Sequence, residues 1–251
     1  MSYDVFSLYY DKLTENVDYS KRAIYFDKLI KKYCKSEGNV LLDLACGTGS
    51  MSEEMAKLNY DVLGVDYSYG MLNQAMQKKI ENNLPIQYIC QDIRNLDLYG
   101  TVDVAICTLD SLNHLESLDE VQMVFSSVFE NLEDGGVFVF DMNTPYKHQY
   151  VLGNQIYIYD TETVYCVWEN QFEPENNTVH IRLDFFEKQE DDSYLRSDEV
   201  ITERAYSQGQ VQDALEKVGF TVKGCYHADT ENPLNSESER MVFVVVKERR
   251  I

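Results

Sequence analysis

Basic side chains are scarce in this chain of 251 residues: 22 lysines and arginines stand against 43 aspartates and glutamates, which gives a formal net charge of -21. A surface of that sign repels a phosphate backbone, so binding to nucleic acid would require a local basic patch. The densest basic cluster, Lys28, Lys31 and Lys32, lies on one predicted helix and is typical of a solvated helix face. We therefore expect no nucleic-acid partner.

Motifs for disulfides and zinc are also lacking. The six cysteines include no C-x-x-C pair and lie mostly within apolar runs, which is typical of buried free thiols in a reducing compartment. No apolar run approaches the length of a membrane span, and no basic and apolar leader opens the chain. We expect a cytoplasmic protein without a bound metal and without a membrane partner.

Strand and helix signals alternate through the first three fifths of the chain, and 44% of the residues are hydrophobic, enough for a sizeable core. The first helix is expected over residues 20–33 with Ser20 as its cap. A second begins near Ser50, where Glu53 completes a capping-box spacing, and a third follows Ser68. The predicted strands are residues 39–43, 62–65, 86–90, 102–107 and 137–141. Such alternation predicts a parallel sheet.

After Pro145 the pattern changes to that of an antiparallel sheet, with turns rich in Asn, Asp and Glu between strands. The expected strands are residues 155–159, 164–172, 179–188 and 194–206. A helix and two strands then return to the first unit. We predict a doubly wound, mostly parallel seven-stranded α/β domain from residues 1–144 and 207–251, with an antiparallel β insert at 145–206 that serves as a substrate cap or a dimer element.

The most informative segment is a glycine turn, Leu42-Asp-Leu-Ala-Cys-Gly-Thr-Gly49, between a predicted strand and a predicted helix. Glycines at such a turn bring exposed backbone amides close to a ligand. A nicotinamide fingerprint requires a third glycine, but Ser52 occupies that position. The turn therefore argues against a nicotinamide oxidoreductase.

Three carboxylates stand at the ends of successive predicted strands: Asp43, Asp66 and Asp92. In open α/β sheets, ligands bind over the carboxyl ends of the strands. Three acceptors suit a ligand that carries an ammonium group, a ribose diol and an adenine amino group, whereas a phosphate-bearing cofactor has little use for them.

With these residues the sequence resembles the class I S-adenosylmethionine-dependent methyltransferases. The resemblance covers the first three fifths of the chain, at Val40 to Gly49, Val65-Asp66, Asp92-Ile93, Asp103 to Leu115 and Gly135-Gly136. It implies S-adenosylmethionine as the cofactor. Many members of the family have glycine where this chain has Ala45, and a methyl group there is tolerable if the backbone angle is ordinary.

The resemblance also implies roles for single residues. Gly47 and Gly49 would approach the methionine part, Asp66 would accept from the ribose hydroxyls, and Asp92 with Ile93 would meet the adenine. Asp43 would organise the turn or hold the methionine ammonium group. The other residues that we expect to contact the cofactor are Tyr10, Tyr19, Ala45, Thr48, Tyr67, Met71 and Thr108.

A narrower resemblance is carried by Tyr9-Tyr10-Asp11, Asp18-Tyr19 and Asn113-His114-Leu115. These motifs are similar to the bacterial small-molecule group, which includes nucleotide-sugar N-methyltransferases. In that group the N-terminal segment closes over the cofactor as a lid. The same aromatic residues would otherwise pack the first helix onto the domain. The residues concerned are Tyr3, Phe6, Tyr9, Tyr10 and Tyr19.

The candidate catalytic residues are His114 and Asp110, which follow the fourth predicted strand. Methyl transfer from a sulfonium needs proximity, orientation and the removal of one proton from the acceptor. His114 is the candidate base or else a capping or packing residue; Asp110 is a base, a substrate ligand or a cap. We expect a small-molecule acceptor with a nitrogen or oxygen nucleophile. A tRNA or rRNA methyltransferase, a non-catalytic cofactor-binding module and a homodimer remain open alternatives.

Overall fold

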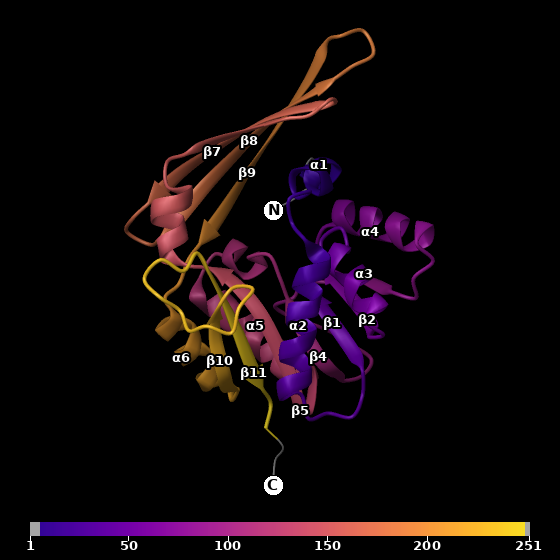
Figure 1. Cartoon of the computed structure of the whole chain (residues 1–251), viewed down its shortest axis with the longest axis vertical. Helices are drawn as coiled ribbons and strands as arrows, with labels where there is room; N and C mark the ends of the chain where they lie inside the picture. Colours follow the sequence, from indigo (N-terminus) through magenta and orange to yellow (C-terminus); the bar gives the residue numbers. More distant parts are fainter. Residues whose placement is uncertain (1–5, 249–251) are drawn as a thin grey trace.

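A seven-stranded sheet forms the body of the computed structural model, which describes residues 6–248 (Figure 1). Its strand order is β10-β11-β5-β4-β1-β2-β3. The strands are β1 Val40–Leu44, β2 Asp61–Asp66, β3 Gln87–Cys90, β4 Val102–Cys107, β5 Leu132–Asn143, β10 Thr221–His227 and β11 Arg240–Val246. β10 and β11 pair antiparallel with each other, and β11 pairs antiparallel with β5; the other pairings are parallel. The predicted mostly parallel sheet is confirmed.

Helices cover both faces of this sheet because the central strands are apolar on both sides. β4 is buried along its whole length. Side chains of α2 and α3 share one core with the sheet, and those of α5 and α6 share the other. The helices are α1 Phe6–Leu13, α2 Tyr19–Tyr33, α3 Ser50–Lys57, α4 Tyr69–Glu81, α5 Leu118–Asn131 and α6 Gln208–Val218. The strand order reverses beside β1, so a crevice opens over the carboxyl ends of β1 and β4.

Two of the predicted helix caps are wrong. The cap of α2 is Asp18 rather than Ser20: its carboxylate accepts from the Lys21 amide at 3.0 Å. α3 has no capping box, because its N-cap is Gly49, which offers no side chain, and the Ser50 hydroxyl accepts from a lysine of α4 instead. The prediction that a helix follows Ser68 is confirmed, and Ser68 is the N-cap of α4.

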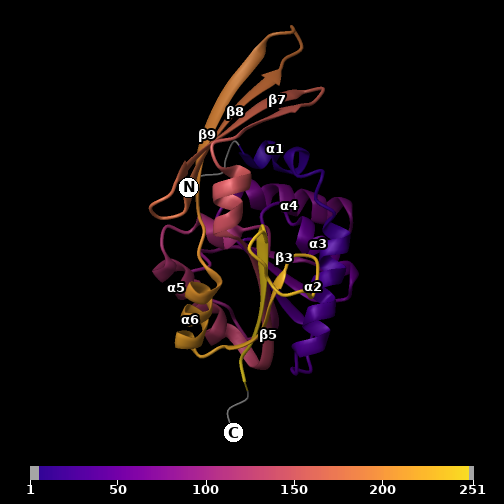
Figure 2. The same cartoon turned by 60° about the vertical axis from the view of Figure 1, so that its left-hand side comes forward.

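The predicted antiparallel insert is a separate four-stranded sheet in the order β6-β7-β8-β9. Its strands are β6 Ile156–Asp160, β7 Val164–Glu173, β8 Thr178–Lys188 and β9 Tyr194–Arg204. One face packs on α1, which lies between the insert sheet and α4 in both cartoon views (Figures 1 and 2). The domain boundaries that we drew from the sequence stay a prediction.

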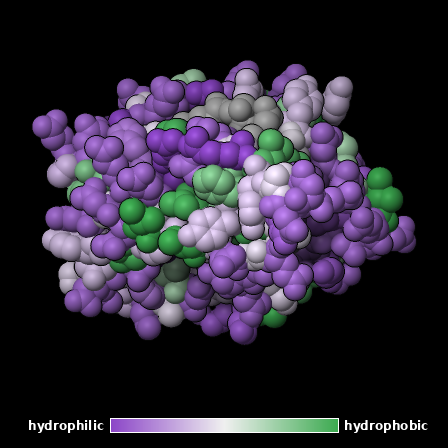
Figure 3. Space-filling view, turned by 90° about the horizontal axis from the view of Figure 1, so that it is seen from above, coloured by the Kyte–Doolittle hydropathy of each residue, from purple (hydrophilic) through white to green (hydrophobic). Residues whose placement is uncertain are grey.

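The other face of the insert sheet is partly apolar: Ile156, Ile158 and Val200 are exposed there. Seen from above, the molecule shows a few hydrophobic side chains among many hydrophilic ones (Figure 3). That the insert serves as a dimer element stays a prediction.

Three short elements were not expected from the sequence. They are α1, a 3-10 helix η1 at Ser111–His114 and a π-helical turn η2 at Lys147–Leu152. Within residues 6–248, none of the helices combines the length and the apolar composition that a membrane span requires.

Candidate functional site

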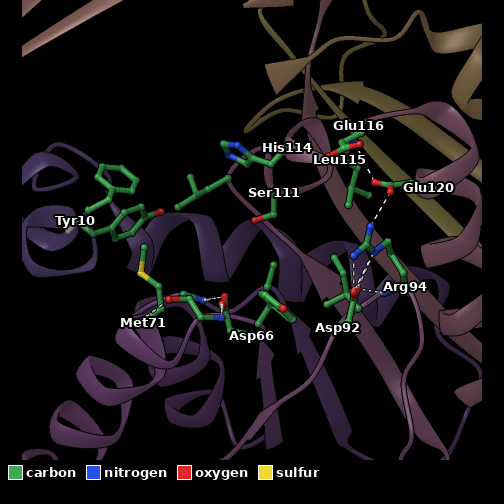
Figure 4. Close-up of a pocket in the computed structure, with 17 residues that line it drawn as sticks. Tyr10, Asp66, Met71, Asp92, Arg94, Ser111, His114, Leu115, Glu116 and Glu120 are labelled. Atoms are coloured by element: carbon green, nitrogen blue, oxygen red, sulfur yellow. Dashed lines mark hydrogen bonds and ion pairs between the residues drawn. The ribbon is translucent and has the colours of Figure 1, made fainter. Parts of the chain in front are cut away.

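A pocket of about 320 Å³ lies over the carboxyl ends of the central strands, and α1 forms part of its wall (Figure 4). Nine predicted site residues line it: Tyr10, Ala45, Gly47, Asp66, Tyr67, Met71, Asp92, Ile93 and His114. Six do not: Tyr19, Asp43, Thr48, Gly49, Thr108 and Asp110. Tyr3, which we expected in the lid, lies outside the described residues.

The glycine turn runs from β1 to α3 in a left-handed backbone conformation. Gly47 has a φ of 55° and Gly49 a φ of 79°, and a Cβ atom added at Gly49 would lie 2.3 Å from the Tyr88 hydroxyl oxygen. Ala45 also has a positive φ, of 51°. The backbone angle at Ala45 is therefore not ordinary, and its methyl group strains the turn.

Asp66, at the end of β2, faces the pocket beside this turn. Its two carboxylate oxygens accept from the backbone amides of Gly47 and Ser68, each at 2.8 Å. Burial raises the pKa of Asp66 despite these bonds. The carboxylate thus fixes the turn, and its remaining lone pairs are available for hydroxyl donors.

Asp43 and Thr48 lie behind the turn. Asp43 is 1% exposed and accepts from the Ser52 hydroxyl at 2.5 Å. Burial raises the pKa of Asp43 to about 7, with the nearby Asp66 charge as a further cause. The Thr48 hydroxyl donates to Asp11 of α1 at 2.6 Å. Both side chains therefore support the turn from outside the pocket.

Asp92, after β3, is paired with Arg94 at one end of the pocket (Figure 4). The Arg94 guanidinium donates to both Asp92 carboxylate oxygens, the shortest contact being 2.6 Å, and its other arm donates to Glu120 of α5 at 2.7 Å. The side-chain hydrogen bond from Arg94 lowers the pKa of Asp92. Arg94 thus already donates hydrogen bonds to both oxygens of the carboxylate that we expected to face the adenine.

The turn after β4 is strained and held by a buried carboxylate. Leu109 and Asp110 have φ values of 57° and 56°. Their amides donate to Asp141 of β5 at 3.1 and 2.9 Å, and Asp141, fully buried, also accepts from Arg22 and Arg240. This turn leads directly into η1, which carries Ser111 and His114 into the pocket.

Asp110 lies just outside the pocket, in an ion pair with Arg240 at 3.0 Å and a hydrogen bond from Asn143 at 2.7 Å. Burial alone would raise its pKa, but the positive charges of Arg240 and Lys147 outweigh burial and hold the pKa of Asp110 well below its usual range. An acid so depressed is a poor proton acceptor near neutral pH.

Tyr10 reaches the pocket from α1, on the opposite side from the Asp92–Arg94 pair (Figure 4). Burial raises the pKa of Tyr10 well above its ordinary value, and the charges of Tyr19 and Asp110 add to the effect. Its hydroxyl therefore stays protonated and serves as a hydrogen-bond donor. Tyr19 itself donates to Thr14 at 3.3 Å.

Several lining residues were not named as site residues from the sequence. Leu109, Ser111 and Leu115 fall within the fourth-strand segment of the family resemblance, so their position was a usable signal. Ser68, Arg94, Glu116 and Glu120 also line the pocket. Glu120 reaches the site because α5 packs beside it, and no local sequence pattern predicts that contact.

The charge of the pocket lining fits S-adenosylmethionine. Four carboxylates face the pocket, and Arg94 is the single lysine or arginine among the described lining residues. The carboxylates are those of Asp66, Asp92, Glu116 and Glu120. Acceptors of this kind suit a ligand with a sulfonium, an ammonium group and a ribose diol. Among residues 6–248, no group of three or more His, Cys, Asp or Glu side chains is arranged to hold a metal ion.

Comparison with known proteins agrees with this geometry. Residues 41–136 match the family described as methyltransferase domain. A protein of Geobacillus sp. (strain WCH70), named as a methyltransferase, is 30% identical over 247 residues, which cover 98% of this chain and all of that protein. The solved structure of an S-adenosylmethionine-dependent methyltransferase from Clostridium acetobutylicum ATCC 824 is 32% identical with a TM-score of 0.86, covering 98% of this chain and 99% of that chain.

A more distant structure is the sugar N-methyltransferase KedS8 from Streptoalloteichus sp. ATCC 53650. It has a TM-score of 0.77 at 19% identity, covering 99% of this chain and 94% of that chain, and so shows the shared fold. The chain belongs to the S-adenosylmethionine-dependent methyltransferases. It is an enzyme that uses S-adenosylmethionine, and its structural neighbours include sugar N-methyltransferases.

Proposed function

We propose that this enzyme methylates an amino or hydroxyl group of a small acceptor, with His114 as the base. The observation that carries the proposal is the lining of one pocket: Asp66 and the glycine turn lie on one side, and His114 reaches in from η1 (Figure 4). The cofactor residues and the candidate base are thus within one cavity.

The cofactor would lie along the pocket in the direction set by these side chains. Gly47 and Ala45 would face the methionine part, and Asp66 would accept from the ribose hydroxyls. Ile93 would provide an apolar contact for the adenine, next to the Asp92–Arg94 pair. Tyr10 and Met71 would cover the end that is closer to α1.

When bound, S-adenosylmethionine supplies a methyl group whose bond to sulfur breaks as the acceptor lone pair bonds to the carbon, leaving S-adenosylhomocysteine. The protein orients the acceptor and removes a proton from it. His114 would take that proton.

The acceptor class is proposed from the structural neighbours of the chain and from the charge of the pocket lining. KedS8 is a sugar N-methyltransferase, and CalS10 from Micromonospora echinaspora is an amino pentose methyltransferase. An amino sugar fits a pocket rich in carboxylates, since Glu116 can accept from its hydroxyl or amino groups. We therefore propose amino sugars as the first acceptors to screen.

The experiment has a binding step and a turnover step. Calorimetric titration with S-adenosylmethionine, S-adenosylhomocysteine and NADH should show binding of the two sulfur compounds alone. Asp66→Ala should abolish that binding, and an unchanged affinity would remove the ribose assignment. A screen for S-adenosylhomocysteine release with amino sugars, small amines and hydroxy acids then identifies the acceptor.

His114→Ala should bind S-adenosylhomocysteine normally and lose most of its turnover. The matched control is His180→Ala, because His180 lies on the exposed face of the insert, away from the pocket. Full activity of His114→Ala would reject His114 as the base and would leave the assignment of the cofactor unaffected.

A further inference from the structure

Helix α1 has two different kinds of contact on its two sides. Toward the insert it packs apolar side chains: Tyr9 stacks on Phe185 with ring centroids 4.7 Å apart, and Leu13 is buried in the same cluster. Three hydrogen bonds add to this contact, from the Phe6 amide to Glu199, the Tyr9 hydroxyl to Glu187 and the Lys12 ammonium group to Thr163. Toward the pocket it presents Phe6 and Tyr10. The helix thus forms a wall that joins the pocket to the insert.

A polar cluster ties α1 to the glycine turn. Asp11 of α1 accepts from the Thr48 hydroxyl at 2.6 Å and from the Lys78 ammonium group at 2.9 Å. Lys78, on α4, also donates to the hydroxyls of Thr48 at 3.1 Å and of Ser50 at 2.8 Å. The three donors of the ammonium group therefore have three acceptors, contributed by α1, the turn and the start of α3.

We propose that Asp11, Thr48 and Lys78 form a latch that holds α1 across the cofactor pocket and links its closure to the glycine turn. This inference rests on the assignment of the pocket to the cofactor. The latch residues do not line the pocket; they are positioning residues that act through α1 and the turn.

The two sides of α1 differ in how easily they can separate. The side chains of Lys78 and Asp11 are 23% and 45% exposed, so water can replace their mutual contact at little cost. Separation from the insert would expose Phe185 and Leu13, which is costly. Opening of the pocket should therefore part α1 from the turn and leave it on the insert.

The test uses S-adenosylhomocysteine as the probe, with its dissociation rate measured by surface plasmon resonance. Lys78→Met keeps most of the length of the side chain and removes its charge and its hydrogen-bond donors. We expect the dissociation rate to rise about fivefold, which corresponds to about 1 kcal/mol, the upper range for a partly exposed ion pair. The association rate should rise as well, because the latch also holds α1 across the pocket of the ligand-free protein. Asp11→Asn should have a similar effect, and the double variant should be no faster than the stronger single variant.

The matched control is Lys79→Met, the same substitution at the next residue of α4. The Lys79 side chain makes no hydrogen bond or ion pair with any residue of the described chain. Its dissociation rate should equal that of the unmodified protein.

Hydrogen exchange of residues 6–13 provides a readout that does not require bound ligand. Loss of the latch should speed exchange of these amides in Lys78→Met and not in Lys79→Met, with and without S-adenosylhomocysteine. A lower melting temperature with an unchanged dissociation rate and unchanged α1 exchange would make the cluster merely structural and overturn the latch. Failure of the unmodified protein to bind S-adenosylhomocysteine would refute the cofactor assignment, while the exchange comparison would still decide whether Lys78 holds α1.

Discussion

Ala45 carries its methyl group on a backbone with a φ of 51°, a conformation that costs most residues with a Cβ atom about 1–2 kcal/mol. The sequence analysis identified the substitution for glycine but not the angle, because a residue name does not determine φ. The structure shows that the turn keeps its left-handed form regardless. The hydrogen bond from Gly47 to Asp66 is one of the contacts that impose it.

We expect Ala45→Gly to stabilise the protein by about 0.5–1 kcal/mol, because relief of strain exceeds the added freedom of the unfolded chain. Urea denaturation measures the difference. Gly47→Ala is the reverse control: φ at Gly47 is 55°, and the nearest atom to an added Cβ, the Met71 sulfur, is 4.0 Å away. It should destabilise by about 1 kcal/mol through the backbone alone. A destabilised Ala45→Gly would show that the turn is not strained at this residue.

The raised pKa of Asp43 predicts that the stability of the protein depends on pH. Its pKa is raised to about 7 by burial, above the ordinary 3.8 of the unfolded chain. The folded state therefore binds more protons between these values, and the Asp43 contribution to stability falls as pH rises through 7. Asp43→Asn removes this titration. The stability of the unmodified protein relative to Asp43→Asn should thus fall by about 2–3 kcal/mol between pH 5 and pH 8. A difference that is constant with pH would contradict the raised pKa.

At the scale of elements, η1 is fastened to the sheet by Asn113. This side chain is fully buried; it donates to the carbonyls of Asn143 at 3.3 Å and Arg204 at 2.9 Å, and accepts from the Asn143 amide at 2.9 Å. Since the next residue is His114, Asn113 links the position of the proposed base to β5 and β9.

We expect Asn113→Ala to destabilise the protein by about 1–3 kcal/mol, because the buried Asn143 amide loses its acceptor. Turnover of the folded fraction should fall as well, while affinity for S-adenosylhomocysteine should stay within twofold. Thermal denaturation and calorimetry measure the two effects. Asn95→Ala, at an exposed asparagine, is the control. Equal turnover in both variants would show that the position of η1 does not affect catalysis.

Most elements could be predicted because their patterns are local. Most strands of the seven-stranded sheet and the antiparallel insert were predicted to within a few residues, since apolar alternation and turn residues specify them; β5 begins at Leu132, earlier than the predicted residue 137. The cap of α2 was misplaced because Ser20 and Asp18 are both good caps and the choice depends on where the chain enters the helix. α1 was not predicted as a helix; it is short, and packing on the insert, which is distant in sequence, stabilises it.

For the whole molecule, the net charge of -21 bears on the choice of acceptor. We expect no binding of tRNA in an electrophoretic mobility assay, even at about 50 mM salt, where phosphate contacts are strongest. A basic protein of similar mass serves as the positive control. Retardation of the tRNA would favour an RNA acceptor over a small-molecule acceptor.

The family, the cofactor and the order of the chemical groups along the chain could be inferred from the sequence, because the glycine turn and the acids at strand ends lie in short segments whose spacing is a local property. What each of these groups contacts depends on the tertiary structure. Some of these contacts join segments that are distant in sequence, and others depend on the direction of a side chain. Examples are the ion pairs of Arg94 with Asp92 and Glu120, the ion pair of Asp110 with Arg240 and the hydrogen bond from Thr48 to Asp11. Such contacts follow from the packing of the helices and the insert on the sheet, and packing is a property of the complete fold.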